Sequence, residues 1–233
     1  MGIDAIRVFI GYDPRQPIAA QVLAHSIWER SSRPVSITRL KLSQLPIKRK
    51  GLTEFTFSRY LVPHLCGYAG NALFIDADML CLGDIAQLDE LCRLQGAPVC
   101  VVPHNMVFER PSLMYFNNAL CQNLTPRFIE EGQPQMLKWA ASVGAIPHEW
   151  NHLVGYDKPR PDAKIVHFTQ GIPFYEEVED CEYADEWRSE LANSMSTVSW
   201  TDLMGGSVHA PVVLARKGAN LPSNGKGDKH HIQ

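Results

Sequence analysis

The chain has 233 residues, of which 45% are hydrophobic and 20% are charged. This length allows one large α/β domain or two small ones, and a compact domain of this size buries roughly 70% of the surface that its unfolded chain exposes. The formal net charge of −3 points neither to nucleic acid nor to a strongly anionic membrane. No apolar run approaches the roughly 20 residues that cross a bilayer, although a peripheral membrane contact is left open.

The first segments predict a parallel α/β unit. Residues 6–12 are rich in β-branched and aromatic side chains and predict a strand that ends at Gly11. A helix is expected over 17–30, because Pro17 suits a first helical position. Residues 35–40 then predict a second strand. The order strand, helix, strand is typical of a parallel sheet.

The next segment is polar and irregular. Residues 41–54 are interpreted as a solvated loop, and the alternative is that Lys48–Lys50 forms a basic lip near a phosphate or an acidic acceptor. Residues 55–65 predict a helix that carries Arg59, with Pro63 shaping its end.

A buried strand is predicted over 73–76. Asp84 can act as the N-cap of a helix over 85–94. Residues 98–102 predict a further buried strand, and 114–117 a short one.

The segments after residue 124 predict two helices, a last strand and one stretch without clear periodicity. Thr125 is expected to start a helix that Gly132 stops. Residues 143–156 show no clear periodicity, 164–168 predict a last core strand, and 185–194 a helix.

These elements predict a single domain over 1–217. Residues 218–233 have almost nothing to bury, so a disordered tail is expected there. The six cysteines form no C-x-x-C pair and are interpreted as reduced, mostly buried thiols. Since no basic segment followed by an apolar region opens the chain, a cytoplasmic location is expected.

The candidate chemistry begins where the 73–76 strand ends. Asp76 and Asp78 follow a buried run, at the position where open α/β sheets bind ligands. Two carboxylates spaced in this way can share a divalent cation such as Mn²⁺ or Mg²⁺, which can hold a diphosphate. His167 closes another strand and is the expected third ligand. The alternative is that Asp76 caps a turn, Asp78 is solvated and His167 is a core residue.

Four segments carry a family resemblance. Residues 57–65, 72–79, 83–85 and 167–171 resemble, in order and spacing, the R-x-x-x-P, Y-x-D-x-D, G-D-I and H-F-x-G motifs of family 8-type glycosyltransferases. The resemblance covers roughly residues 6–190.

This resemblance implies a GT-A fold, an α/β domain with a mostly parallel central sheet flanked by helices. It implies a UDP-sugar donor, Mn²⁺ and the metal ligands Asp76, Asp78 and His167. Asp76, Asp78, Arg59 and Asn117 are then expected to be catalytic. The expected nucleotide- and sugar-binding residues are Gly11, Tyr12, Asp13, Arg59, Ile75, Asp76, Ala77, Asp78, Asn117, Trp150, Asn151, His152 and Gly171.

Two motifs depart from the family pattern. The family's H-F-x-G-x-x-K-P-W run is replaced by residues 167–174, in which Gly171 comes one place later and no Lys follows. The diphosphate grip must then come from Arg59, Lys158 or backbone N–H groups around Gly171. The family's F-N-x-G motif is altered to residues 116–119, which leaves Asn117 as a sugar contact.

The segment 149–152 could form a wall for a sugar. Trp150 offers a flat apolar face, and Asn151 and His152 can bond to hydroxyls. The alternative is a long surface loop anchored by the Trp.

The function expected is therefore transfer of a sugar from a UDP-sugar to an acceptor hydroxyl, with retention of configuration. An inverting reaction would need a carboxylate base, for which Glu149, Asp157 and Asp162 are the candidates. One alternative is a non-catalytic protein that binds sugar nucleotides. A phosphoryl-transfer enzyme of the haloacid-dehalogenase type is less consistent, because Met79 to Cys81 offer no Thr after the acidic pair.

Overall fold

The computed structural model describes residues 4–103, 111–195 and 211. All the elements below belong to a unit that ends at Ser194. The tail predicted over 218–233 lies outside the described residues, and the domain boundary predicted at 217 stays a prediction.

A six-stranded sheet has the order β2-β1-β3-β6-β5-β7. Its strands are β1 (Ile6–Gly11), β2 (Val35–Leu40), β3 (Asn71–Ile75), β5 (Val99–Val101), β6 (Leu113–Asn117) and β7 (Val143–Ala145). β1 is parallel to β2 and β3, and β5 is parallel to β7, whereas β6 runs antiparallel to both β3 and β5. The sheet is therefore mixed, and its parallel part contains the strands around β1.

A second, three-stranded sheet has the order β4-β9-β8. Its strands are β4 (Met79–Cys81), β8 (His152–Leu153) and β9 (Ile165–His167). β9 is antiparallel to β4 and parallel to β8. Because β4 starts one residue after Asp78, this small sheet is joined directly to the segment that follows β3.

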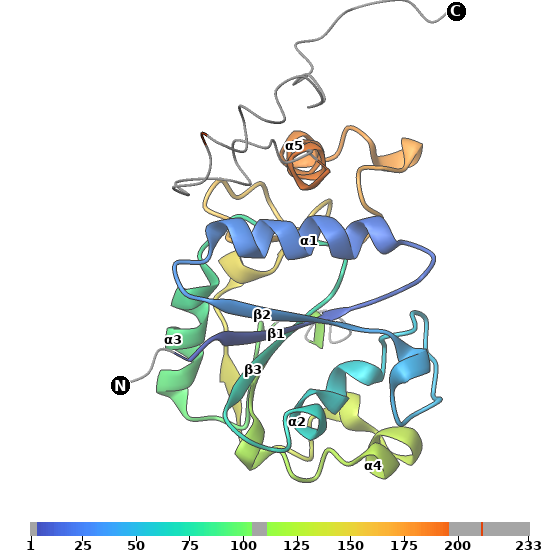
Figure 1. Cartoon of the computed structure of the whole chain (residues 1–233), viewed down its shortest axis with the longest axis vertical. Helices are drawn as coiled ribbons and strands as arrows, with labels where there is room; N and C mark the ends of the chain where they lie inside the picture. The colour runs from blue at the N-terminus through green and yellow to red at the C-terminus, as the bar shows by residue number, and fades with distance from the viewer. Residues whose placement is uncertain (1–3, 104–110, 196–210, 212–233) are drawn as a thin grey trace, which may run out of the picture. The chain divides into compact units, whose positions relative to one another are not determined.

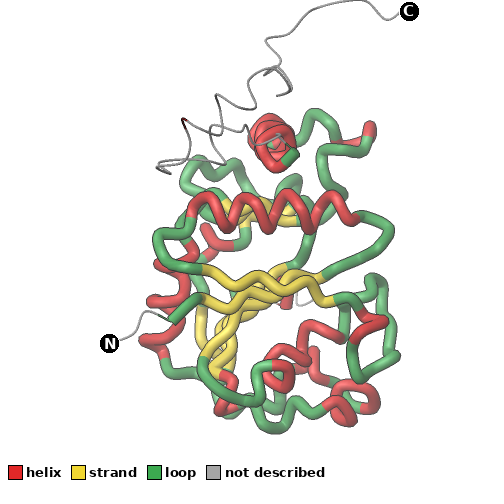
Figure 2. Tube along the Cα trace, in the orientation of Figure 1, coloured by secondary structure: helices red, strands yellow, loops and turns green. Residues whose placement is uncertain are grey.

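Helices cover both faces of the large sheet. The helices are α1 (Pro17–Arg30), α2 (Val62–Leu65), α3 (Ile85–Gln95), α4 (Pro126–Glu131) and α5 (Ala184–Ser194). Short 3₁₀ turns are η1 (Leu42–Gln44), η2 (Ser58–Leu61), η4 (Asn118–Leu120), η5 (Pro134–Met136), η6 (His148–Trp150) and η7 (Glu176–Val178). Figure 1 shows α1 on one side of the sheet and α2 and α4 on the other. The layers are also visible along the chain trace in Figure 2.

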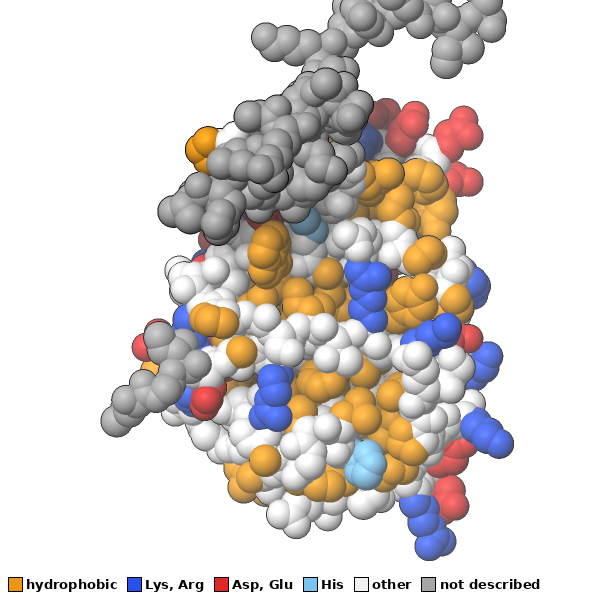
Figure 3. Space-filling view, viewed as in Figure 1, with side chains coloured by type: hydrophobic (Ala, Val, Ile, Leu, Met, Phe, Trp, Pro, Cys, Tyr) orange, Lys and Arg blue, Asp and Glu red, His pale blue; other side chains and the backbone are white. Residues whose placement is uncertain are grey.

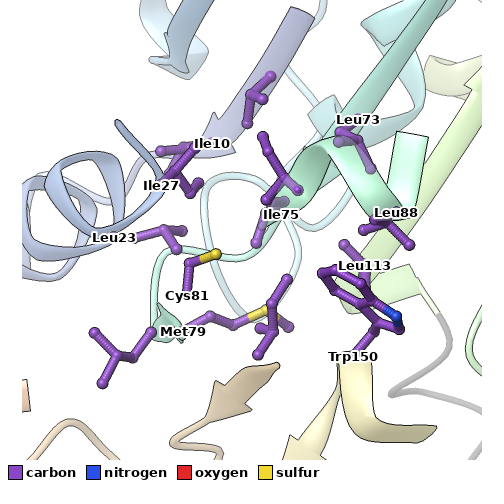
Figure 4. Packing of buried hydrophobic residues seen from close by; sticks show 14 of the residues in the cluster. Ile10, Leu23, Ile27, Leu73, Ile75, Met79, Cys81, Leu88, Leu113 and Trp150 are labelled. Atoms are coloured by element: carbon purple, nitrogen blue, oxygen red, sulfur yellow. The ribbon is translucent and has the colours of Figure 1, made fainter. Parts of the chain in front are cut away.

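The alternation of side chains along the strands divides the core in two. In β1, Val8 and Ile10 pack with α1, α3 and the small sheet, whereas Phe9 packs with η2, α2 and α4. In β3, Ile75 belongs to the first cluster and Phe74 to the second. Figure 4 shows the first cluster from close by. The central strands β1, β3, β6 and β5 are buried on both faces, which explains why they read as nearly continuous apolar runs, whereas the edge strands β2 and β7 are largely exposed.

Several predicted elements are confirmed. The strand at the N-terminus, α1 and β2 lie where the pattern placed them. The N-cap of α3 is also confirmed, since the backbone N–H of Ala86 donates to Asp84 Oδ1 at 2.9 Å. Gly96 follows α3 with a φ of 62°, which a residue without Cβ adopts at little cost.

The predicted helix over 55–65 is corrected. The segment forms the 3₁₀ turn η2 and only then the short helix α2. Pro63 lies in the first turn of α2, where its missing N–H leaves no hydrogen bond unmade, so it shapes the start of this helix rather than its end. Three short strands, β4, β7 and β8, were not anticipated.

Candidate functional site

The candidate site lies where β1 and β3 end. These strands are parallel, with Ile10 opposite Ile75, so the residues that follow them leave the sheet at the same edge. The backbone N–H of Asp76 donates to the carbonyl of Ser112 at 2.9 Å. The turn after β3 is thereby tied to the start of β6.

Asp76, Asp78 and His167 come together at this edge. Each offers one ligand atom, and the three atoms lie within 4.8 Å of one another. His167 Nε2 is 3.4 Å from Asp78 Oδ1. This grouping was expected from the sequence, and the arrangement fits a divalent cation, because carboxylate oxygens and an imidazole nitrogen are common ligands of such ions.

The small sheet brings His167 to the acidic pair. Met79 at the start of β4 pairs with His167 at the end of β9. The backbone N–H of Phe168 donates to the carbonyl of Asp78 at 2.9 Å. The His167 and Asp78 side chains therefore project from neighbouring backbone positions that hydrogen bonds hold in register.

Asp78 is the more accessible of the two acids, with 32% of its side chain exposed. Burial raises the pKa of the Asp78 carboxyl, but in the acidic range where this carboxyl titrates, the charge and hydrogen bond of a protonated His167, with the charge of Arg59, outweigh it and hold the pKa below its ordinary value. Asp78 is thus in the ionised form that binds cations.

Arg59 lies under the site rather than on its surface. Its Nη2 is 3.0 Å from Asp76 Oδ1 and its Nη1 donates to the Pro111 carbonyl at 2.7 Å. Its guanidinium also lies 5.0 Å from the centre of the Phe74 ring, and the residue is 6% exposed. Arg59 is therefore a buried counter-ion of Asp76.

The edge of β1 has its own contacts. A Cβ on Gly11 would lie 2.6 Å from the Phe55 ring, so only glycine fits at this close approach. Tyr12 is half-buried. Asp13 is buried and accepts from Arg15 Nη2 at 2.5 Å. The Arg15 hydrogen bond is the main cause that lowers the pKa of Asp13.

Three residues expected at the site are placed elsewhere. Trp150 is 1% exposed and packs within the core, which agrees with the alternative of an anchoring Trp. His152 is also buried, with Nε2 3.0 Å from Glu182 Oε2. Asn117 is opposite Asn71, at the far end of β3 from Asp76, because β6 runs antiparallel.

Asn151 lies beside the site but in an unexpected position. It is fully buried, and its Oδ1 is 3.1 Å from His167 Nδ1. It therefore contacts the back of the imidazole rather than open space where a sugar could bind. Nothing in the local pattern indicated this contact, because β8 was not anticipated.

The loop after β9 is shaped by Gly171. Its φ of 124° is unfavourable for residues with a side chain, and its N–H donates to the Phe168 carbonyl at 2.9 Å. The carbonyls of Pro111 and Ser112 also take part in the site. No signal in the sequence could have identified them, since any residue carries a carbonyl group.

The surface of the described residues adds two observations. On the face shown in Figure 3, Lys and Arg side chains are mostly separated by hydrophobic and uncharged surface. Within residues 4–103 and 111–195, no helix has the length and apolarity needed to cross a membrane.

Comparison with solved structures identifies the fold. The apo structure of the WbbM bifunctional glycosyltransferase superposes with a TM-score of 0.63 at 16% identity, over 85% of this chain and 50% of that chain. GlyE of Streptococcus pneumoniae gives 0.58 at 17%, over 93% and 64%. The galactosyltransferase LgtC, in complex with donor and acceptor sugar analogues, gives 0.55 at 12%, over 83% and 97%. The chain thus spans half of WbbM and has a GT-A, glycosyltransferase-like α/β fold, which confirms the expected fold class.

Comparison with curated sequences identifies a relative. No family model matches the chain. Protein CDI of Arabidopsis thaliana is 36% identical over 223 residues, which cover 79% of this chain and 85% of that protein. The chain therefore belongs to the family of Protein CDI.

Proposed function

We propose that this protein is a metal-dependent glycosyltransferase of the family 8 type. It transfers a sugar from a UDP-sugar to an acceptor hydroxyl with retention of configuration. The observation that carries the proposal is the grouping of Asp76, Asp78 and His167 at the edge of a GT-A sheet. The fold alone would support a glycosyltransferase ancestry, and the ligand group adds the means to bind a nucleoside diphosphate.

Asp76, Asp78 and His167 are the residues that would hold a divalent cation. The mixed oxygen and nitrogen donor set favours Mn²⁺ over Mg²⁺, which prefers oxygen ligands and keeps much of its water. When bound, such a cation supplies electrostatic stabilisation of the departing diphosphate.

Arg59 tunes the charge of this site. Two carboxylates and one guanidinium leave a net charge of about −1 around the three ligands, counting His167 as neutral. Because Arg59 Nη2 lies near both oxygens of Asp76, it holds that carboxylate in place and balances part of its charge.

Three groups were expected to bind the diphosphate in place of the family's Lys. The Arg59 guanidinium already binds Asp76 and the Pro111 carbonyl, and the Gly171 N–H already donates to Phe168. Lys158 is exposed. We therefore propose Lys158 for this role, because an exposed, flexible ammonium group can bind a phosphate as a point charge.

The nucleoside is placed at the edge formed by Gly11, Tyr12 and Asp13, with Ile75 and Ala77 contributing backbone. Asp13 already binds Arg15, so the pair rather than the free carboxylate would face the base. The retaining route needs no carboxylate base, since the donor diphosphate can assist the incoming hydroxyl. Two of the candidate bases already have partners: Asp157 accepts from the Leu153 N–H at 2.8 Å, and Asp162 lies 3.5 Å from Arg160.

The experiment is a thermal-shift screen of UDP-sugars with Mn²⁺, followed by an assay of UDP release. A ligand that binds only the folded state raises Tm, by an amount that grows with its concentration over Kd. The proposal expects a Mn²⁺-dependent shift with at least one UDP-sugar, and slow release of UDP from the same donor. It is rejected if no nucleotide sugar shifts Tm with or without metal.

A non-catalytic protein that binds sugar nucleotides is the second candidate. It would show the same Mn²⁺-dependent shift but no UDP release with any acceptor. The haloacid-dehalogenase alternative has lost its support, because the solved structures that superpose on this chain have the GT-A fold.

A further inference from the structure

A fully buried amide stands behind the imidazole of the candidate metal centre. Asn151 is 0% exposed, and its Oδ1 lies 3.1 Å from His167 Nδ1. Its other amide atom, Nδ2, has no hydrogen-bond partner among the described residues. A buried N–H group without a partner is costly, so an apolar residue of similar size would pack here at lower cost. Within the described part of the chain, the bond to His167 is the side-chain hydrogen bond that offsets this cost.

The position of Asn151 is fixed by the residues on either side of it. Trp150 is anchored in the core, with Lys164 Nζ 4.9 Å from the centre of its ring. His152 is held by Glu182 and begins β8. The parallel pairing of β8 with β9 places Leu153 opposite His167. The Asn151 side chain is therefore presented to the imidazole by a backbone that cannot easily move.

The chemistry of the contact determines which imidazole nitrogen carries the proton. An amide oxygen accepts only, so a neutral His167 that bonds to Oδ1 must carry its proton on Nδ1. The lone pair is then on Nε2, the atom that faces Asp78. With the opposite amide orientation, a donor would face Nδ1, the proton would move to Nε2, and no lone pair would face the acidic pair.

We propose that Asn151 is a positioning residue, which holds His167 in the Nδ1–H tautomer so that Nε2 can bind the cation. The inference rests on the proposed metal site and deepens it. Each strand of the small sheet then adjoins one residue of this arrangement. β4 follows Asp78, β9 ends in His167, and β8 follows Asn151. Second-sphere bonds of this kind commonly change metal affinity by about 10–100-fold.

The test uses three variants and the metal alone. Asn151→Leu removes the acceptor, and Asn151→Asp keeps an oxygen against Nδ1. Asn118→Leu is the matched control, because Asn118 is also 0% exposed and its Nδ2 donates to the Ala69 carbonyl at 3.1 Å, away from the site. Mn²⁺ affinity is measured by the electron paramagnetic resonance signal of free Mn²⁺. The tautomer is measured from the imidazole ¹⁵N shifts of the metal-free protein at a pH where those shifts show a neutral ring, with the His167 signals assigned by their loss in His167→Gln.

Asn151→Leu should weaken Mn²⁺ binding by about 10–100-fold, whereas Asn151→Asp should bind at least as well as the wild type. Asn118→Leu should leave Mn²⁺ affinity unchanged even if it lowers stability. The wild-type spectrum should show the Nδ1–H tautomer of His167. A proton on Nε2, or wild-type Mn²⁺ affinity in Asn151→Leu, would overturn the inference.

The two proposals can fail separately. If the wild type binds no Mn²⁺, the metal site of the proposed function fails, and the tautomer of the wild type still decides the role of Asn151. If Asn151→Leu does not fold, the wild-type spectrum and the Asn151→Asp variant carry the test. If Asn151→Leu folds and keeps the Nδ1–H tautomer of the wild type, the result counts against the inference.

Discussion

Arg59 and Asp76 form an ion pair in which both side chains are buried, at 7% and 10% exposed. Nη2 of Arg59 lies 3.0 Å from Oδ1 and 3.3 Å from Oδ2 of Asp76. Breaking a buried pair by removing one partner costs more than the pair itself contributes, because an uncompensated charge stays behind. The pair therefore links the stability of the fold to the charge of the candidate site.

Replacement of Arg59 by Met should be severe. It leaves the Asp76 carboxylate buried and unbalanced, so the free energy of unfolding should fall by about 3–5 kcal/mol in urea titrations. The double variant Arg59→Met/Asp76→Leu should recover a large part of this loss, since no charge remains. A loss below about 1 kcal/mol in the single variant, as for an exposed pair, would contradict the assignment.

Replacement of Asp78 by Ala should separate binding from stability. A third of this side chain is exposed, so the fold should persist and Tm should change little. Mn²⁺-dependent UDP binding, measured by calorimetry, should be lost, and EDTA should have the same effect on the wild type. Asp162→Ala is the matched control, because that carboxylate is 71% exposed and outside the group. Unchanged Mn²⁺-dependent affinity in Asp78→Ala would remove the metal site.

Much of the fold and the acidic pair of the ligand group were predictable because their signals are local. Pro17 at the first turn of α1 and the Asp84 cap of α3 act over three or four residues. The apolar run of β3 and its acidic end also lie within one short segment. Since parallel strands end at a common edge, the position of Asp76 followed from the α/β order alone.

The expected site residues that lie away from the ligand group have a common physical cause, which is that strand direction and burial are set by distant partners. Nothing within residues 113–117 shows that β6 runs antiparallel to β3, yet this direction places Asn117 at the far end. The aromatic and polar residues around Trp150 were read as a binding wall because β8, only two residues long, has no pattern of its own. Its pairing with β9 decides which side chains are buried.

Stability should depend on pH through Asp84. Burial raises the pKa of this carboxyl, but hydrogen bonds from Ser32 and the Ala86 N–H outweigh it and leave the pKa below 3.8. Between the folded and the unfolded pKa the unfolded state binds more protons, so the Asp84 contribution is complete above about 3.8 and is lost as the pH falls through the folded value.

The variant Asp84→Ala measures this contribution. At pH 7 it should lower the free energy of unfolding by about 0.5–2 kcal/mol, the usual cost of losing an N-cap. The difference between variant and wild type should shrink as the pH falls from about 3.8 towards the folded-state pKa of Asp84, and level off below it. A difference that is constant down to the lowest pH at which the fold survives would show that the charge of the carboxylate does not matter.

Trp150 gives the sharpest contrast between the sequence-based interpretation and the structure. Figure 4 shows it packed near Leu88 and Leu113, so Trp150→Ala should cost about 3–5 kcal/mol of unfolding free energy. If Trp150 stacked on a sugar, its replacement would instead raise KM and leave stability unchanged. The control for the loss of an aromatic side chain is Tyr156, which is 57% exposed. Tyr156→Ala should stay within about 0.5 kcal/mol of the wild type, as surface substitutions usually do. If Trp150→Ala kept full stability and weakened only sugar binding, the ring would have to reach the ligand, and the core packing described for it could not hold in the working protein.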